Sequence, residues 1–339
     1  MIGYYVHHQG RGHLHRALAV AEHLTTPVTG LSTLPRPAGW PGDWIELPDD
    51  AVGSVTDADA RGRLHWVPER HRGLRDRMGE ISSWIVDLDP DLMVVDVSVE
   101  VSLLARLHGV PVLVMAQPGD RTDAPHELGY GLACRVVGPW PADAGELLRS
   151  CRAEDVATVG AFSRFDLRDR VLSSGTGAGC RRAVFLAGAG GTEVTSRELE
   201  AAIAETPGWD WTVLGREGAW RDDPWEELCR ADVVVTHAGQ NAVAEVAAAQ
   251  VPAVVVPQVR PFGEQLATAR ALARSDTLPV VVRPTFPDGG WDDVLDTAAQ
   301  LDGRRWLAWN DGGGARRAAA VVEATLSAGE RRARLGAPT

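Results

Sequence analysis

Residues 231–265 carry the sequence ADVVVTHAGQNAVAEVAAAQVPAVVVPQVRPFGEQ. Two apolar runs, 233–235 and 252–257, are rich in β-branched residues and predict buried parallel strands, and the alanine-rich stretch 242–250 predicts a helix between them. A polar, glycine-containing loop, residues 236–241, follows the first strand. Ligands of open α/β sheets bind at such loops, and the unpaired N–H groups that begin the next helix favour a phosphate.

Polar side chains surround this loop. His237 and Asn241 can donate hydrogen bonds to phosphate oxygens, and Glu245 follows Asn241 by one helical turn, so both project from the same face. A carboxylate in that place can accept hydrogen bonds from a diol such as a ribose. Glu264 and Gln265 follow the second strand, at the same edge of the sheet, where they can bind hydroxyl groups. Together these residues predict a nucleotide-sugar site.

This pattern resembles the donor-binding signature of inverting glycosyltransferases of the GT-B fold, similar to the MurG-like, UDP-glycosyltransferase and family 28 C-terminal-like enzymes. The matching residues are His237, Gly239, Asn241, Glu245, Val251, Pro252, Glu264 and Gln265. The resemblance implies that His237 and Asn241 contact the diphosphate and that Glu245 holds the ribose. It also implies that Glu264 and Gln265 hold hydroxyl groups of the transferred sugar.

Each of these residues also has a purely structural explanation. The turn at 236–239 could simply connect strand to helix, Glu245 could be a solvated helix residue, and short motifs match by chance at appreciable rates. The number of matches, in the expected strand–loop–helix–strand context, favours the binding site. Two departures leave the transferred sugar open: the loop 258–263 is longer than in the plant-type signature, and Glu264 stands where Asp is commoner.

The composition narrows the class of protein. A length of 339 residues suggests about two domains, at roughly 150 residues each. The hydrophobic fraction of 45% and the charged fraction of 24% are typical of a soluble globular protein that buries a large core. The net charge of −12 argues against nucleic acid or an anionic membrane surface as the main partner.

The basic residues and the cysteines exclude further classes. All 34 basic residues are arginine, which excludes a P-loop lysine and a Schiff-base lysine. The four cysteines have no Cys-x-x-Cys spacing and are typical of reduced thiols in a cytoplasmic protein. We expect no signal peptide, because the apolar start is too short, and no transmembrane helix, because no apolar run reaches 18 residues.

A second strand–loop–helix unit opens the chain. Residues 1–6 predict a strand, 7–13 a glycine-bearing loop and 14–24 a helix. A helix N-terminus disfavours the protonated form of a nearby histidine, and a general base must be neutral. In the resembled family, the His of a Gly-His pair in this loop faces the acceptor hydroxyl, which implies that His13 is the base. His7, His8 and His15 crowd the same loop and are alternatives, and His13 could also only cap or pack the helix.

Asp96 ends the predicted strand 92–95 and therefore lies in the same layer as the first loop. The resemblance implies that this Asp orients the catalytic His. A carboxylate on one imidazole nitrogen fixes the tautomer and stabilises the imidazolium that forms when the other nitrogen accepts a proton. A helix N-cap is nearly as good an explanation for Asp96, and Glu100 and Asp120 are weaker candidates for the orienting role.

Other segments of the first half are less informative. The Asp-x-Asp pairs 57–59 and 87–89 could bind a metal, but such pairs are common by chance in an acidic chain, and we expect no metal. Residues 64–77 contain four Arg and two His, and we interpret them as a solvated acceptor-side loop leading into a helix. Residues 117–131 show no clear periodicity and are expected to line the acceptor site.

The second half begins with a strand at 183–187 and a glycine-rich loop. Glu193 occupies the third glycine position of the dinucleotide-binding fingerprint, which disfavours an NAD(P) oxidoreductase. The loop suits close approach of a diphosphate to the backbone, as the resemblance implies. Its candidate binding residues are Gly188, Gly190, Gly191 and Thr192, and residues 215–225 could frame the nucleobase.

We therefore predict an α/β protein of GT-B architecture, with two doubly wound parallel-sheet (Rossmann-like) domains facing across a cleft. The expected boundaries are 1–163 for an acceptor-binding domain, 164–179 for a linker and 180–339 for a nucleotide-sugar-binding domain, whose last helix crosses back to the first.

The predicted activity is that of an inverting glycosyltransferase of the hexosyltransferase type. It would move a sugar from a UDP- or dTDP-sugar to the hydroxyl of a small-molecule or lipid-linked acceptor, without a cofactor. Two alternatives remain: a nucleotide-sugar epimerase or hydrolase on the same fold, and a non-catalytic protein that binds a nucleotide-sugar. The acceptor and the oligomeric state leave no signal in the sequence.

Overall fold

All neighbouring strands of the two large sheets run parallel, as the βαβ patterns predict. The structure, a computed structural model, describes residues 1–336 except 146, 171–179, 189–190 and 216–220. The chain forms two units. The first unit contains Met1–Pro139, Leu148–Val159 and Ala315–Thr339, and the second contains Trp140–Leu147 and Gly160–Gly314.

The first unit is built on a seven-stranded sheet of order β3-β2-β1-β4-β5-β7-β9. Its strands are β1 (Ile2–Val6), β2 (Val28–Ser32), β3 (Asp43–Glu46), β4 (Leu92–Asp96), β5 (Val112–Met115), β7 (Arg135–Gly138) and β9 (Val156–Thr158). The central strands β1, β4 and β5 are buried along their whole length, because apolar residues face both sides of a parallel sheet. A separate two-stranded sheet pairs β6 (Gly119–Asp120) with β8 (Leu148–Arg149).

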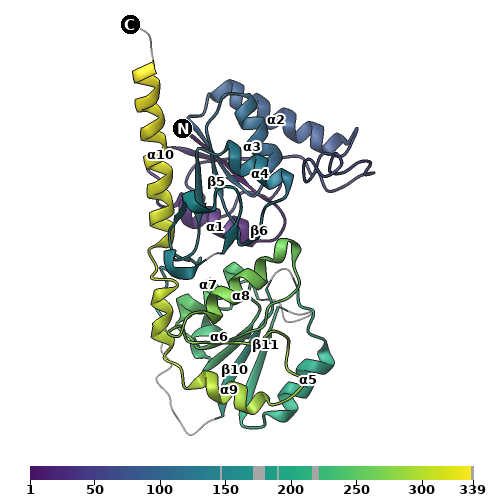
Figure 1. Cartoon of the computed structure of the whole chain (residues 1–339), viewed down its shortest axis with the longest axis vertical. Coiled ribbons are helices and arrows are strands. Elements are labelled where there is room, and N and C mark those ends of the chain that lie inside the picture. Colours follow the sequence, from purple (N-terminus) through teal and green to yellow (C-terminus); the bar gives the residue numbers. More distant parts are fainter. Residues whose placement is uncertain (146, 171–179, 189–190, 216–220, 337–339) are drawn as a thin grey trace. The chain divides into compact units, whose positions relative to one another are not determined.

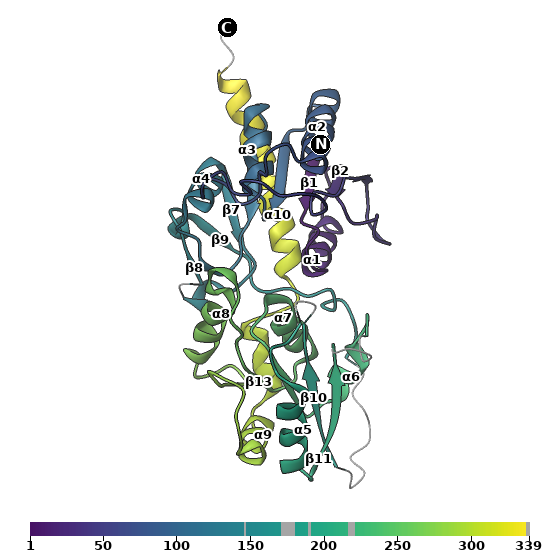
Figure 2. The ribbon, with the colours of Figure 1, turned by 90° about the vertical axis from the view of Figure 1, so that its right-hand side faces the viewer.

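Helices follow most of these strands, and Figures 1 and 2 show them around the sheet. They are α1 (Gly12–Ala21), α2 (Arg72–Leu88), α3 (Val99–Leu107), α4 (Ala124–Leu132) and the final helix α10 (Gly314–Gly336), with a short 3₁₀ turn η2 (Ala153–Asp155). Each places its apolar stripe against the sheet or a neighbouring helix, as Ile81, Trp84 and Ile85 do in α2.

The second unit has a five-stranded sheet of order β11-β10-β12-β13-β14. Its strands are β10 (Arg181–Leu186), β11 (Trp209–Leu214), β12 (Val233–Thr236), β13 (Ala253–Val255) and β14 (Val280–Val282). Its helices are α5 (Ser196–Glu205), α6 (Trp225–Arg230), α7 (Gln240–Ala249), α8 (Glu264–Ala273) and α9 (Trp291–Ala299), with 3₁₀ turns η1 (Ala142–Ala144), η3 (Pro261–Gly263) and η4 (Gly303–Ala308). A core of Phe185, Leu199, Trp291 and Leu295 joins α5 and α9 to the sheet.

After an earlier excursion into the second unit at Trp140–Leu147, the chain passes from the first unit to the second between Val159 and Gly160. This point precedes the stretch 164–179 that we expected as a linker: residues 164–170 belong to the second unit, and 171–179 lie outside the described residues. The chain returns at Ala315, so that most of α10 belongs to the first unit.

Helix α10 is fixed to the first unit by packing and by one carboxylate. Its buried residues recur at helical spacing on one face: Ala315, Ala318, Ala319, Val322 and Leu326. Glu323 accepts hydrogen bonds from the backbone N–H groups of Thr25 and Thr26, at 2.8 and 2.9 Å, and from both threonine hydroxyls, at 3.0 and 2.7 Å. These bonds lower the pKa of Glu323 against the opposing effect of burial.

We expect Glu323→Gln to destabilise the first unit by about 1–3 kcal/mol, because an amide satisfies these four donors less well than a carboxylate. Urea unfolding at pH 7 measures the loss. Glu80→Gln, which changes an exposed residue of α2, is the matched control and should unfold like the wild type. An equal midpoint for all three proteins would contradict this role of Glu323.

Three sequence-based expectations need correction. Residues 117–131 show no clear periodicity in the sequence but do contain regular structure, since α4 occupies Ala124–Leu132. The segment 64–77 is not a solvated loop throughout: Arg77 is 1% exposed, ion-pairs with Asp50 at 3.2 Å and donates to the hydroxyl of Tyr5 at 2.7 Å. Helix α8, which begins at Glu264, was not anticipated.

Candidate active site

The sheet order of the first unit brings two loops together. Strand β1 lies between β2 and β4, so the chain leaves β1 toward one edge of the sheet and leaves β4 toward the other. Such a reversal of strand order opens a crevice at the carboxyl ends of the two strands, where α/β proteins bind ligands. Val6 pairs with Asp96 at this end. The loop after β1 leads into His13 on the first turn of α1.

His13, Asp96 and Arg16 meet at this position. His13 Nδ1 lies 3.1 Å from Asp96 Oδ1. Arg16, one turn after His13 on α1, donates from Nε to Asp96 Oδ2 at 3.1 Å and from a terminal nitrogen to Asp96 Oδ1. The same terminal nitrogen of Arg16 lies 3.1 Å from His13 Nδ1. The structure thus places the two predicted residues together and adds an arginine.

The carboxylate of this group is buried and ionised. Asp96 is 0% exposed and Arg16 is 6% exposed. Burial by itself raises the pKa of Asp96, but the Arg16 guanidinium and then His13 outweigh it and hold the pKa at about 2. Burial lowers the pKa of Arg16, but the Asp96 carboxylate raises it. The net effect is a raised pKa for Arg16. The pair therefore keeps both charges at neutral pH.

The geometry separates His13 from the alternative histidines. His7 is half-buried, and its desolvation, together with His13 and His8, lowers its pKa to about 3. The backbone N–H of Gln9 donates to His7 Nδ1 at 3.1 Å, which places the ring proton on Nε2. His8 lies 3.8 Å from Asp50, and its ring stacks on His7. Neither contacts Asp96 in the way that His13 does.

The alternative carboxylates have other partners. Ser98, not Asp96, caps α3, since its hydroxyl accepts from the N–H of Val101 at 3.2 Å. Glu100 accepts from the N–H of His65 at 2.7 Å and of Trp66 at 3.1 Å, which ties it to another loop. Asp120 bonds Thr122 and Arg149. Asp96 therefore fits the orienting role better than these groups.

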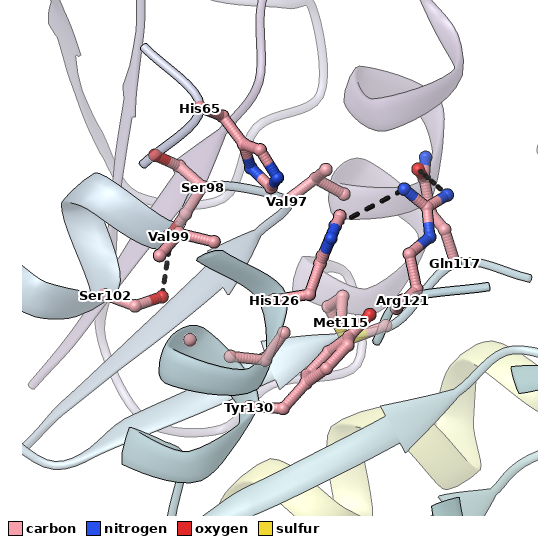
Figure 3. A pocket seen from close by; sticks show the side chains of 12 residues that line it. His65, Val97, Ser98, Val99, Ser102, Met115, Gln117, Arg121, His126 and Tyr130 are labelled. Carbon is pink, nitrogen blue, oxygen red and sulfur yellow. Dashed lines mark hydrogen bonds between the residues drawn. The ribbon is translucent and has the colours of Figure 1, made fainter. Parts of the chain in front are cut away.

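A pocket of about 30 Å³, roughly the space of one water molecule, adjoins this group within the first unit (Figure 3). Val97, which directly follows Asp96, lines it and has a φ of 70°, a strained value for a β-branched residue of the kind found at functional sites. Tyr130 forms another wall and interacts electrostatically with Arg16. Figure 3 shows His65, Gln117, Arg121 and His126 around the same space, with Val99 and Met115 on its apolar side.

His65, Asp123 and His126 form a second histidine–aspartate group at this pocket. His65 Nε2 lies 2.9 Å from Asp123 Oδ2, and His126 Nδ1 contacts Asp123 Oδ1. Burial lowers the pKa of His126 to about 4, so its imidazole is neutral at pH 7. Arg121 approaches His126 Nε2 at 3.4 Å. These atoms complete a chain of hydrogen bonds, and the arginine makes the place less suited to a cation.

Among the described residues, one other group brings metal-ligating atoms together, His8 with Asp49 and Asp50. Arg77 ion-pairs with Asp50 there, so a cation is already present. The Asp-x-Asp pairs 57–59 and 87–89 belong to neither group.

The second unit repeats the reversal of strand order, now between β10 and β12. Here the loop after β10 meets the loop after β12: the Thr192 hydroxyl lies 2.8 Å from His237 Nε2. His237 Nδ1 lies 3.0 Å from the carbonyl oxygen of Val256, to which it donates as Nδ1–H, leaving Nε2 to accept from Thr192. Burial lowers the pKa of His237, so the ring is neutral at pH 7.

The N-terminus of α7 supplies the helix dipole at this place, with Gly239 as the N-cap and Asn241 exposed on the first turn. Gln265 lies beside Gly239 and accepts from the N–H of Gln258 at 2.9 Å. Glu264 is half-buried at the start of α8. Gly188 and Gly191 flank the loop, whereas Gly190 lies outside the described residues.

Glu245 has a partner that the sequence did not predict. It is buried, which contradicts the alternative of a solvated helix residue, and Arg164 donates to its carboxylate at 2.8 Å. Arg164 also donates to the carbonyl oxygen of Asp222 at 2.7 Å. Burial raises the pKa of Glu245, and Arg164 opposes the rise. A diol at Glu245 would therefore share the carboxylate with an arginine.

Comparison with known proteins assigns the class. Residues 221–281, which contain β12, α7 and β13, match the model of the glycosyltransferase family 28 C-terminal domain. The matched segment lies wholly within the second unit. No curated protein sequence is significantly similar to the chain.

Solved glycosyltransferases share the fold over nearly the whole chain. The glycosyltransferase of kitacinnamycin is 17% identical, with a TM-score of 0.66 over 96% of this chain and 98% of that one. MurG of Acinetobacter baumannii is 16% identical, with a TM-score of 0.63 over 95% and 98%. The spinosyn rhamnosyltransferase SpnG, solved with thymidine diphosphate, is 16% identical, with a TM-score of 0.60 over 96% and 99%. These likenesses establish the GT-B fold, and the domain match makes the chain a glycosyltransferase.

Three arginines of this glycosyltransferase escaped the sequence analysis. Arg16 and Arg164 contact predicted residues, and Arg260 donates to the carbonyl oxygen of Gly191 at 3.3 Å, which adds a cation beside the second-unit loop. Only the position of Arg16, one helical turn after His13, gave a usable signal. Among the helices of the described residues, none has the length and apolar character needed to cross a membrane.

Proposed function

We propose that this glycosyltransferase moves a sugar from a UDP- or dTDP-sugar to an acceptor hydroxyl in a single displacement that inverts the anomeric carbon. The observation that carries the proposal is the contact of His13 Nδ1 with the buried carboxylate of Asp96. A neutral imidazole that donates from Nδ1 to a carboxylate has its lone pair on Nε2, where it can accept a proton.

In the proposed reaction, His13 Nε2 takes the proton of the acceptor hydroxyl while the oxygen attacks the anomeric carbon. The bond from that carbon to the diphosphate oxygen breaks, and the nucleoside diphosphate leaves with the electron pair. Asp96 stabilises the imidazolium, and no further co-reactant is needed. The small pocket beside Val97 and Tyr130 has room for no more than a single small group of the acceptor, and the rest of the acceptor would lie outside it.

The second unit supplies groups suited to the diphosphate. The N-terminus of α7, Asn241 and Arg260 can all stabilise negative charge there. Glu245 would accept from the ribose and Gln265 from the sugar. The thymidine diphosphate held by SpnG supports a pyrimidine nucleotide for this chain as well.

We expect one of UDP, dTDP and GDP to bind with micromolar affinity, measured by titration calorimetry. Thr192→Val and Glu245→Gln should each raise the Kd for that nucleotide at least tenfold, which is about 1.4 kcal/mol of binding free energy, because each removes a hydrogen-bonding group from the site. Thr277→Val and Glu226→Gln, which change exposed residues of the same unit, are the matched controls. If none of the three nucleotides binds, the proposed donor is wrong.

Turnover distinguishes the reaction from its alternatives. The donor for this assay is a nucleotide-sugar of the nucleotide that binds. Proton NMR should show that the transferred sugar has opposite anomeric configurations in the product and in the donor. Epimerised sugar, or free sugar formed as fast with or without any acceptor, would contradict transfer. Binding without turnover across a panel of phenols and aliphatic alcohols would instead indicate a protein that only binds nucleotide-sugars.

A further inference from the structure

The Asp96 carboxylate is shared between two cationic or potentially cationic groups. Arg16 engages both of its oxygens, and His13 engages Oδ1. Arg16 and Asp96 are almost completely buried, so water does not screen this contact. The orienting carboxylate is therefore already neutralised by an ion pair before His13 takes a proton.

We propose that Arg16 is a positioning residue, which holds the Asp96 carboxylate against His13 and limits how strongly that carboxylate stabilises a proton on the imidazole. The catalytic meaning of this role rests on His13 acting as the base.

The hydrogen-bonding inventory supports this role. Arg16 can only donate, and ionised Asp96 can only accept. His13 Nδ1 lies 3.1 Å from both the carboxylate and a terminal nitrogen of Arg16, so it can serve one of them at a time. A proton on Nδ1 bonds Asp96 and leaves Nε2 available to the acceptor. A proton on Nε2 would let Nδ1 accept from Arg16 and would block the base. Arg16 forms a bidentate hydrogen bond with Asp96, so its guanidinium is directed at the carboxylate. This arrangement favours the tautomer of His13 that carries its proton on Nδ1.

Two histidines and two tyrosines near this pair are uncharged at neutral pH. The His7 ring lies 5.5 Å from the His13 ring, and its lowered pKa keeps it neutral. His8 interacts electrostatically with His13, and burial lowers its pKa as well. Tyr4 and Tyr130 interact with Arg16, and burial raises the pKa of both hydroxyls. Asp96 and Arg16 are the charged groups whose contacts with His13 Nδ1 are described above.

Arg16→Gln should make His13 easier to protonate. Removing the guanidinium leaves the Asp96 charge to act on the imidazole alone, and an uncompensated opposite charge at this distance favours the protonated imidazole. Arg16→Lys keeps the charge but loses the planar two-pronged geometry, so it should give a smaller rise. Both proteins are titrated by carbon–proton NMR of the histidine rings in the full chain, with the His13 signal assigned by its loss in His13→Gln.

Arg72→Gln is the matched control, because it removes an arginine whose side chain is 90% exposed on α2. The midpoint of the His13 titration in this variant should equal that of the wild type. An unchanged His13 titration in Arg16→Gln, with a lowered melting temperature, would show that Arg16 has only a structural role. If Arg16→Gln does not fold, Arg16→Lys decides: a raised titration supports the proposal, and an unchanged one overturns it.

The same variants separate this inference from the proposed function. The NMR titration needs no nucleotide or acceptor, so it can support the role of Arg16 even if no nucleotide binds. Where transfer is measurable, the acid limb of kcat/KM should move to higher pH in Arg16→Gln by the same amount as the His13 titration. If the His13 titration shifts but the acid limb of kcat/KM does not, then Arg16 affects the protonation of His13, but His13 is not the base.

Discussion

His13→Gln is expected to lower kcat for sugar transfer by about 10²- to 10⁴-fold, the usual contribution of a positioned general base. Glutamine occupies similar space and can still hydrogen-bond Asp96, but it cannot take a proton from the acceptor. Nucleotide binding should be unchanged, since the candidate donor residues belong to the second unit. The rate is measured with the nucleotide-sugar that binds and an acceptor found in the panel of phenols and alcohols.

His23→Gln provides the control, because His23 follows the same helix but lies outside the group of His13, Asp96 and Arg16. It should retain wild-type kcat. A normal rate in His13→Gln combined with a large loss in His7→Gln would assign the base to His7, despite the Gln9 N–H that occupies its Nδ1. A normal rate in both variants would contradict base catalysis by this loop.

Asp96→Asn is expected to destabilise the first unit by about 3–5 kcal/mol, because it leaves the Arg16 guanidinium buried without a counter-charge. The loss should appear in hydrogen–deuterium exchange as faster exchange of β1 and β4, with the second unit unaffected as an internal reference. Asp76→Asn, an exposed change on α2, is the control. Arg16→Met combined with Asp96→Asn should recover part of the stability, since it removes the unpaired charge, and no recovery would contradict this cause.

The same ion pair predicts how the first unit responds to acid. The folded-state pKa of Asp96 is about 2, below its ordinary value of 3.8. Its contribution to stability is therefore fully present above about pH 4 and is lost as the pH falls toward 2, because the unfolded chain binds the proton more tightly. Asp96→Asn should lack this part of the acid sensitivity of the wild type.

The sequence predicted those features that depend on local pattern. Runs such as Val233–Val235 indicated buried strands, and the alternation of strands with helices indicated parallel sheets. Because parallel strands end at the same edge, the position of Asp96 after its strand was enough to expect it near the loop of His13. The loop of Thr192 and that of His237 were both predicted binding elements, and the structure joins them by a hydrogen bond.

The remaining features depend on contacts between distant residues. Arg16 and Asp96 are 80 positions apart, and Arg164 and Glu245 are 81 apart, so neither ion pair leaves a local pattern. Arg77 lies among three other arginines in the sequence, and only the fold shows that it alone turns inward to Asp50 and Tyr5. Helix α4 was missed because Pro125, Gly129 and Gly131 give it low intrinsic helix propensity, although proline is well tolerated in a first turn.

The return of the chain at Ala315 has a consequence for how this enzyme is made and engineered. On the ribosome, the strands of the first unit emerge early, but the helix carrying Val322 and Glu323 emerges only after the whole second unit. The first unit is therefore the last to be completed. Thr25 and Thr26 cannot form their hydrogen bonds to Glu323 until translation is nearly finished. A chimaera that exchanges the first unit between related enzymes must transplant the N-terminal part of the chain together with its matching C-terminal helix to keep that unit intact.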